Sequence, residues 1–299
     1  MKVGMNSKPS ATPTSERVMH GGMRRAGLTT WHWCQNGVPS RIERVNRFLF
    51  IPLFLISVVP AQASAMAPDY SVAVGGRTMP LGAAVSGQLG YGYLLWGEKR
   101  EGDFRYGYLR PALRLQTSGV VNRAEVSLAI HPISFFGFVL GHSQGVRYTD
   151  PYTVDCATAA CRGGLQSTFG KARLVLGHDR FFAGGSSRVD YYVPSRRDRP
   201  FADETSSLVG KQGGDRLLTF DAFAGVWITP ELAAGVLYRA ERMIGTGFSN
   251  NHESAFARWK RGAWGVAAGA GLYQSSTQSR SPTVYGAIEW TGSPSIELQ

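Results

Sequence analysis

The sequence predicts an all-β fold in which about 12 antiparallel strands close into a membrane-spanning barrel, preceded by a cleaved signal peptide. Three observations predict it: an export signal in the N-terminal part, alternation of apolar and polar residues along most of the remaining chain, and the length of the alternating segments. Strands present successive side chains to opposite faces, so a period of two indicates strands and not helices.

The export signal is the apolar run 48–59, which follows Arg41, Arg44 and Arg47 and precedes several small residues that end at Ala65. A basic region, an apolar stretch and small residues are typical of a secretory signal peptide. The run rises only about 18 Å as a helix, which is too short for a ~30 Å hydrocarbon core. We expect a disordered leader or an overextended start at 1–40, a cleaved signal at 41–65 and a single barrel domain at 66–299.

More than half of the excess of basic over acidic residues lies in the segment that we expect to be removed. The whole sequence carries a formal net charge of +11, but only +5 remains after Ala65. A nucleic-acid-binding domain is expected to cluster its basic residues on one helix face. Here the remaining basic residues are instead spaced singly along the predicted strands. We therefore expect no nucleic-acid partner.

Alternation marks each predicted strand. Leu174 and Leu176 share one face of segment 168–176, and Lys171 and Arg173 share the other. The same pattern predicts strands at about 69–77, 84–97, 104–117, 121–131, 134–147, 165–177, 180–193, 215–228, 231–245, 253–261, 264–275 and 282–290.

A soluble β-sandwich also alternates, but two features favour a membrane barrel. The predicted segments are about 10–14 residues long, whereas soluble strands are usually near 5–6 and a tilted transmembrane strand needs about 9–11. Their polar faces carry long charged residues, which are costly in a packed core and natural in a wet lumen. Trp227, Trp259, Trp264 and Trp290 lie near predicted turns, where interface girdles place aromatic residues.

The predicted connections alternate in length. With the N-terminus in the periplasm and an even strand number, short turns fall on the periplasmic side and the two longest loops fall outside. The periplasmic connections are 98–103, 132–133, 178–179, 229–230 and 262–263, and the long outer loops are 150–165 and 195–214.

The last predicted strand, 282–290, closes with the segment 285–290, which ends at the aromatic Trp290. It resembles the C-terminal assembly signal of outer-membrane β-barrel proteins, although this chain continues through residues 291–299. The resemblance covers the architecture of the whole chain after the signal, and no motif ties it to one family. It implies a location in the outer membrane of a Gram-negative bacterium, contact with outer-membrane lipid, folding by the barrel-assembly machinery, and other envelope proteins as further partners.

Cys156 and Cys161 are the two cysteines that follow the signal. In an exported chain such a pair predicts a disulfide, here closing a small loop. A metal site would need two more ligands at useful spacing, and the neighbouring sequence offers none. His131 and His178 fall at predicted turns, where solvation or capping is the simpler interpretation. We expect no metal and no cofactor.

The inward faces of the predicted strands carry more basic than acidic side chains. Either these charges line a narrow aqueous path that favours anions, or they pair across the lumen and fill it. Tyr106, Tyr108, Phe169, Phe223 and Tyr273 also face inward, which favours a narrow or plugged lumen. The predicted lumen-lining charges are Arg110, Arg114, Arg123, Glu125, Lys171, Arg173, Arg188, Asp190, Asp221, Arg239, Glu241, Arg258, Lys260 and Glu289.

An enzyme is the alternative. Residues 141–145 match the G-x-S-x-G pattern of lipases, but no helix is predicted after them, as a nucleophile elbow requires. His142 and Ser143 are adjacent and would point to opposite faces of a strand, so they cannot form a base and nucleophile pair. His142 could still meet Ser167 or another residue on a neighbouring strand. We assign no catalytic residue.

The sequence therefore predicts a non-enzymatic outer-membrane barrel. It is either a narrow passive channel with mild anion preference, or the membrane anchor of an envelope-spanning assembly such as a motility or secretion machine. A barrel acyl hydrolase that acts on outer-membrane lipids is the alternative from another class.

Overall fold

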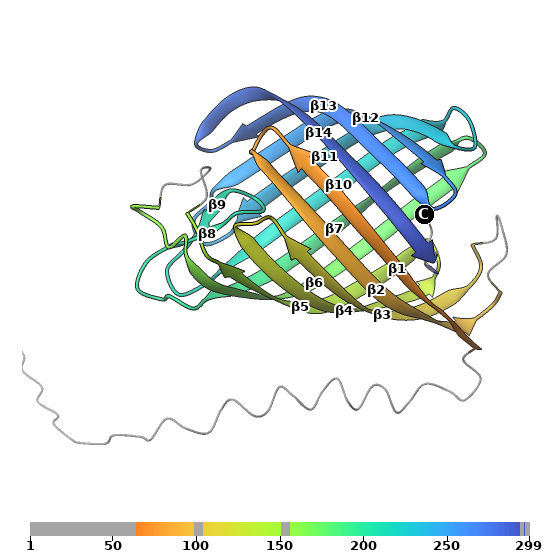
Figure 1. Cartoon of the computed structure of the whole chain (residues 1–299), viewed down its shortest axis with the longest axis horizontal. Coiled ribbons are helices and arrows are strands. Elements are labelled where there is room, and N and C mark those ends of the chain that lie inside the picture. The colour runs from red at the N-terminus through yellow and green to blue at the C-terminus, as the bar shows by residue number, and fades with distance from the viewer. Residues whose placement is uncertain (1–63, 99–103, 151–155, 294–295, 297–299) are drawn as a thin grey trace, which may run out of the picture. The chain divides into compact units, whose positions relative to one another are not determined.

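The computed structural model describes residues 64–98, 104–150, 156–293 and 296. Twelve long strands in this part of the chain form one closed antiparallel barrel (Figure 1). The wall strands are β1 (Ser64–Arg77), β2 (Gly82–Trp96), β3 (Gly107–Thr117), β4 (Val121–Ile133), β5 (Phe136–Arg147), β6 (Gly163–His178), β7 (Phe181–Pro194), β10 (Asp215–Trp227), β11 (Leu232–Met243), β12 (Ser249–Arg261), β13 (Trp264–Ser275) and β14 (Gln278–Ser293).

The prediction of a 12-strand all-β barrel is confirmed, and each wall strand overlaps a predicted one. The described residues contain no helix long and apolar enough to cross a membrane. The expected leader and nearly all of the expected signal lie outside the described residues, so the domain boundaries stay predictions. β1 itself begins at Ser64, slightly before the expected mature start.

Closure depends on β1, which pairs with β2 on one side and with β14 on the other. Val72 lies opposite both Gly87 of β2 and Trp290 of β14. Each remaining strand pairs with its neighbour along the wall, so no wall strand leaves an unpaired edge. A closed barrel satisfies its backbone hydrogen bonds internally, which hydrocarbon demands of any spanning structure.

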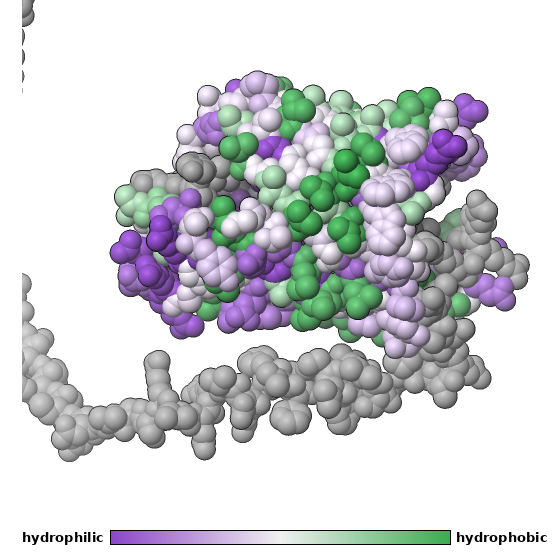
Figure 2. All heavy atoms as spheres, viewed as in Figure 1, coloured by the Kyte–Doolittle hydropathy of each residue, from purple (hydrophilic) through white to green (hydrophobic). Residues whose placement is uncertain are grey.

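The exterior of the barrel is apolar and the interior is polar, the reverse of a soluble protein. Leu174 and Leu176 of β6 are 40% and 51% exposed, whereas Lys171 and Arg173 on the opposite face are partly buried. Figure 2 shows apolar side chains across the middle of the wall and hydrophilic ones gathered at the end that carries the long loops. Exposed apolar residues recur on most wall strands, among them Val74, Leu89, Leu113, Leu115, Val126, Leu140, Val189, Phe220, Val236, Val266, Val284 and Ile288.

The strand parity predicted that the two longest loops share one end of the barrel, and the structure places them there; the other end carries four short turns and the longer connection 97–106 after β2. The turns after β4, β6, β10 and β12 are short and lie at one end of the barrel. The connections after β5 and β7 are long and lie at the other end. The loop between β7 and β10, residues 195–214, contains two further strands that the sequence did not predict, β8 (Phe201–Asp203) and β9 (Leu208–Gly210). They form a small hairpin of their own at the long-loop end (Figure 1).

Candidate functional site

The hairpin β8–β9 folds into the lumen and is held there partly by an apolar cluster. Phe201 has no exposed surface, and its ring centroid lies 5.8 Å from that of Tyr192 on β7. Leu208 on β9 is also buried. The remaining members of the cluster come from four wall strands and one loop: Leu165, Tyr192, Leu217, Met243 and Phe248.

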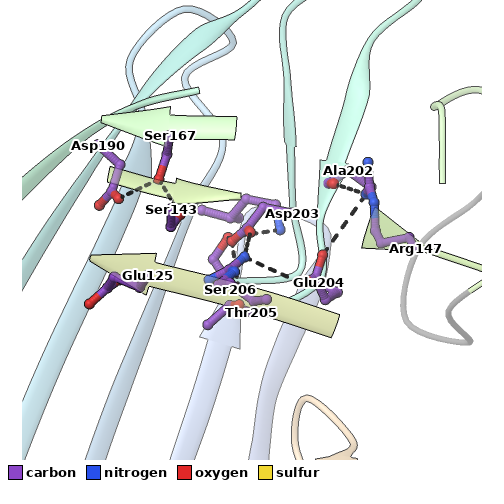
Figure 3. Close-up of polar contacts among 12 residues, drawn as sticks. Glu125, Ser143, Arg147, Ser167, Asp190, Ala202, Asp203, Glu204, Thr205 and Ser206 are labelled. Carbon is purple, nitrogen blue, oxygen red and sulfur yellow. Dashed lines mark hydrogen bonds and ion pairs between the residues drawn. The ribbon is translucent and has the colours of Figure 1, made fainter. Parts of the chain in front are cut away.

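Two inward arginines on β4 and β5 hold the acidic tip of the hairpin. The Nη2 atom of Arg123 lies 3.4 Å from Oδ1 of Asp203 and 3.3 Å from Oε1 of Glu204. Arg147 donates to the carbonyl oxygen of Ala202 and lies 3.9 Å from Oε2 of Glu204 (Figure 3). Burial raises the pKa of the Glu204 carboxyl, as does the Asp203 carboxylate, whereas the charge of Arg123 lowers it.

The turn of the hairpin is built by Asp203. Its Oδ2 atom accepts hydrogen bonds from the backbone N–H of Ser206 at 2.9 Å and from the Ser206 hydroxyl at 2.7 Å. A carboxylate that caps the backbone three residues later is a common way to stabilise a turn. Ser207 completes the turn with a φ of 58°, in the left-handed region. One side chain thus shapes the turn and binds Arg123.

Contacts with β1 and with β12, which lies across the barrel from β4, show that the hairpin crosses the lumen. Arg77 of β1 donates to the carbonyl oxygen of Thr205. Asn250 of β12 donates to the carbonyl oxygen of Ser206 at 2.6 Å. Together with the arginines of β4 and β5 and the apolar cluster, these bonds attach the hairpin around most of the wall. The sequence missed this element because its two strands are only three residues long and its contacts come from distant segments.

The predicted disulfide between Cys156 and Cys161 is confirmed. The loop that it closes lies against the hairpin, since the backbone N–H of Ala160 donates to the carbonyl oxygen of Pro200 at 2.7 Å. Ala202 of β8 is buried in a cluster with residues of this loop. Both sulfurs lie near the Asp150 carboxylate, but a disulfide offers no thiolate for a metal.

Farther along the lumen, acidic side chains pair with arginines. Arg188 forms ion pairs with Asp190 at 2.7 Å and with Glu125 at 3.3 Å, and its guanidinium lies 3.6 Å from the ring centroid of Phe169. Asp221 pairs with Arg239 at 2.6 Å.

The short-turn end of the lumen is narrowed by a second, smaller cluster. Asp69 and Arg110 form a buried ion pair there. The Tyr106 hydroxyl donates to the carbonyl oxygen of Ile296 at 3.1 Å, and Ile296 is only 3% exposed. Tyr108 completes this cluster. The residues that follow the predicted assembly signal thus include one that packs inside the barrel.

The other predicted lumen-lining residues lie on the same inward face. Arg114 is exposed, Glu241 is buried, and Lys171, Arg173 and Lys260 are partly buried. Arg258 and Glu289 approach each other at 3.9 Å. Their role in lining a solute path stays a prediction.

A cavity of about 640 Å³ lies beside the hairpin tip. Glu204 and Thr205 of the tip line it together with inward residues of the wall. The charged and aromatic wall residues in its lining are Arg77, Arg114, Arg123, Arg239, His252 and Tyr285.

The geometry around the G-x-S-x-G segment does not suit a hydrolase. The segment lies within β5, and its Ser143 hydroxyl is buried on the inward face, 2.8 Å from that of Ser167. Ser167 in turn donates to Asp190 at 3.2 Å (Figure 3). His142 is exposed on the outward face, where its Nδ1 atom lies 3.1 Å from the Thr168 hydroxyl. The possible meeting of His142 with Ser167 is therefore wrong, because the two side chains lie on opposite faces.

No family model and no curated protein matches the chain. Among solved structures, the KdgM porin is 11% identical, with 75% of this chain and 98% of that chain covered and a TM-score of 0.40. An outer-membrane channel of Pseudomonas putida F1, COG4313, is 8% identical, with 78% and 98% covered and a TM-score of 0.44. The translocator domain of the autotransporter NalP from Neisseria meningitidis is 11% identical, with 80% and 92% covered and a TM-score of 0.35. Likenesses this distant carry no inference about function.

A closed antiparallel barrel with an apolar exterior and a charged interior defines the class of this protein. It is an outer-membrane β-barrel of the Gram-negative type.

Proposed function

We propose that this protein is a narrow passive channel for small anions, with an outer mouth constricted by the loop 195–214. The observation that carries the proposal is the cavity beside the hairpin tip, because four arginines and a single carboxylate, that of Glu204, line it. A passage lined mainly by one sign of charge concentrates ions of the opposite sign.

The charge excess comes from two arginines in particular. Arg77 donates to the carbonyl oxygens of Pro80 and Thr205 and, among the described residues, to no carboxylate. The Arg114 side chain, which lines the cavity, has no hydrogen-bond or ion-pair partner in the described part of the chain. Arg123 and Arg239, by contrast, are balanced by carboxylates. The preference for anions is accordingly mild, since most charges in the lumen are paired.

The test is a recording of purified protein in planar bilayers. A channel gives steady conductance, and under a potassium chloride gradient its reversal potential shifts toward that of chloride. Replacing residues 196–213 by a short Gly-Ser linker removes the constriction and should raise the conductance. Electrical silence in both proteins would contradict the channel.

A second candidate is the membrane anchor of an envelope-spanning assembly, a function that does not require conduction. The filling of both ends of the lumen, by Phe201 and by Ile296, favours it. An anchor should stay silent after removal of the loop and should co-purify with other envelope proteins from gently solubilised membranes. Contact with lipid and folding by the barrel-assembly machinery are expected for either function.

A further inference from the structure

We propose that the cavity beside the hairpin tip is a saturable binding site for an elongated anion that carries two or more phosphate or carboxylate groups. The inference rests on the proposed function, because a luminal site matters to transport only if solutes pass it. Beyond the electrostatic attraction of anions in general, the inference assigns a specific binding site for polyanions to the lumen.

Arg77 and Arg114, the two cavity arginines without a carboxylate partner among the described residues, start from different positions along the strand direction. Arg77 of β1 lies opposite Gly82 of β2, and Arg114 of β3 lies opposite Gln88 of the same strand β2. Six strand residues separate these positions, which is about 20 Å along the strand direction. Both side chains nevertheless line the same cavity. With their backbones this far apart, the two guanidinium groups suit an extended polyanion that reaches toward both better than a single small ion.

The site is partly organised before any ligand binds. Two backbone carbonyls hold Arg77, one from its own turn and one from the hairpin tip. Asp221 holds Arg239 at 2.6 Å. A ligand therefore does not have to immobilise these side chains, and the entropic cost of binding is reduced.

Groups that can bind ligand oxygens complete the lining. The Nε2 atom of His252 is buried and has no hydrogen-bond partner among the described residues. The His252 ring lies edge-on to Tyr285, with centroids 5.8 Å apart. A buried polar atom without a partner is costly, and a bound oxyanion or its hydroxyl groups can supply one. Gln116, Ser86 and Ser118 line the same cavity.

The test measures binding of tripolyphosphate, a linear polyanion, by calorimetry of the full barrel in detergent. Arg114→Gln is the decisive variant, because it breaks no contact of the described structure. It should weaken tripolyphosphate binding by about tenfold, the effect of losing one charge-assisted hydrogen bond. Arg114→Lys keeps the charge and should recover most of the affinity. Arg258→Gln is the matched control, since this luminal arginine does not line the cavity, and should leave binding unchanged.

Orthophosphate provides the ligand control. A single phosphate group cannot extend between the two arginines, so it should bind more weakly than tripolyphosphate. Equal affinity for the two ligands, equal effects of Arg114→Gln and Arg258→Gln, or no binding of tripolyphosphate would each overturn the site.

Bilayer recordings separate this inference from the proposed function. Tripolyphosphate should reduce the chloride current of the wild type at concentrations that leave Arg114→Gln conducting. A chloride current that tripolyphosphate does not reduce would refute the site and leave the channel standing. Binding by calorimetry to a protein that is silent with and without its loop would support the site and refute the channel.

Discussion

The wall of the barrel and the hairpin inside it are held by different forces. Backbone hydrogen bonds between neighbouring strands hold the wall, and they repeat along its whole circumference. The hairpin has only a few backbone bonds of its own, between β8 and β9. Its place in the lumen depends on particular side chains such as Phe201, Arg123 and Arg147. The wall should therefore tolerate many inward substitutions, whereas single substitutions of the side chains that hold the hairpin should release it.

Phe201→Ala should have the largest effect on the hairpin. Truncation of this fully buried ring should cost its docking about 3–5 kcal/mol, as for large-to-small changes in cores. Hydrogen–deuterium exchange of residues 201–210 should rise strongly, while exchange in the wall strands stays low. Phe104→Ala, an exposed aromatic outside the hairpin cluster, should leave this exchange unchanged. Protection that survives Phe201→Ala would mean that the apolar cluster does not hold the hairpin.

The wall should be sensitive on its outward face. Leu174→Arg places a charge on the outward, lipid-facing side of β6 and should cost up to about 2–4 kcal/mol and impair assembly. Arg173→Leu, the inward neighbour, should fold normally and change conductance slightly or not at all. Folding yield into lipid vesicles, read from heat-modifiable gel mobility, measures both. Similar yields for the two variants would show that the assignment of the two faces is wrong.

Arg147→Ala should have a smaller and purely local effect. It leaves the Ala202 carbonyl without its donor and removes a cation beside Glu204, at a cost of about 1–3 kcal/mol to docking. Conductance should rise toward that of the loop-deleted protein, with no change in folding yield. Arg280→Ala is the matched control, because it breaks an exposed ion pair with Glu253 away from the hairpin. A conductance of Arg147→Ala equal to that of the wild type would contradict the role of Arg147 in holding the hairpin in the lumen.

Proximity along the chain explains which contacts the sequence could predict. Apart from β1 and β14, which close the barrel, the partners of a wall strand are its neighbours along the chain, and a turn such as the one after β6 brings them together directly. The hydrogen bond from Arg77 to the Thr205 carbonyl at the hairpin tip is different, because these two residues are 128 positions apart. No local pattern marks such a pair. The contact of Ile296 with Tyr106 joins residues that are still farther apart, at 190 residues.

The sequence by itself determined the wall, the faces of its strands and the disulfide. Period-two alternation is a local pattern, so the opposite faces of Leu174 and Arg173 can be predicted without the fold. The disulfide can be predicted because an exported chain with two cysteines offers each of them only the other as a partner. Only the tertiary structure decided what fills the lumen. The short strands β8 and β9 are of mixed polarity and carry no periodic signal, so their insertion could not be predicted. The closed wall brings distant side chains within reach, and this decides which carboxylate pairs with each arginine.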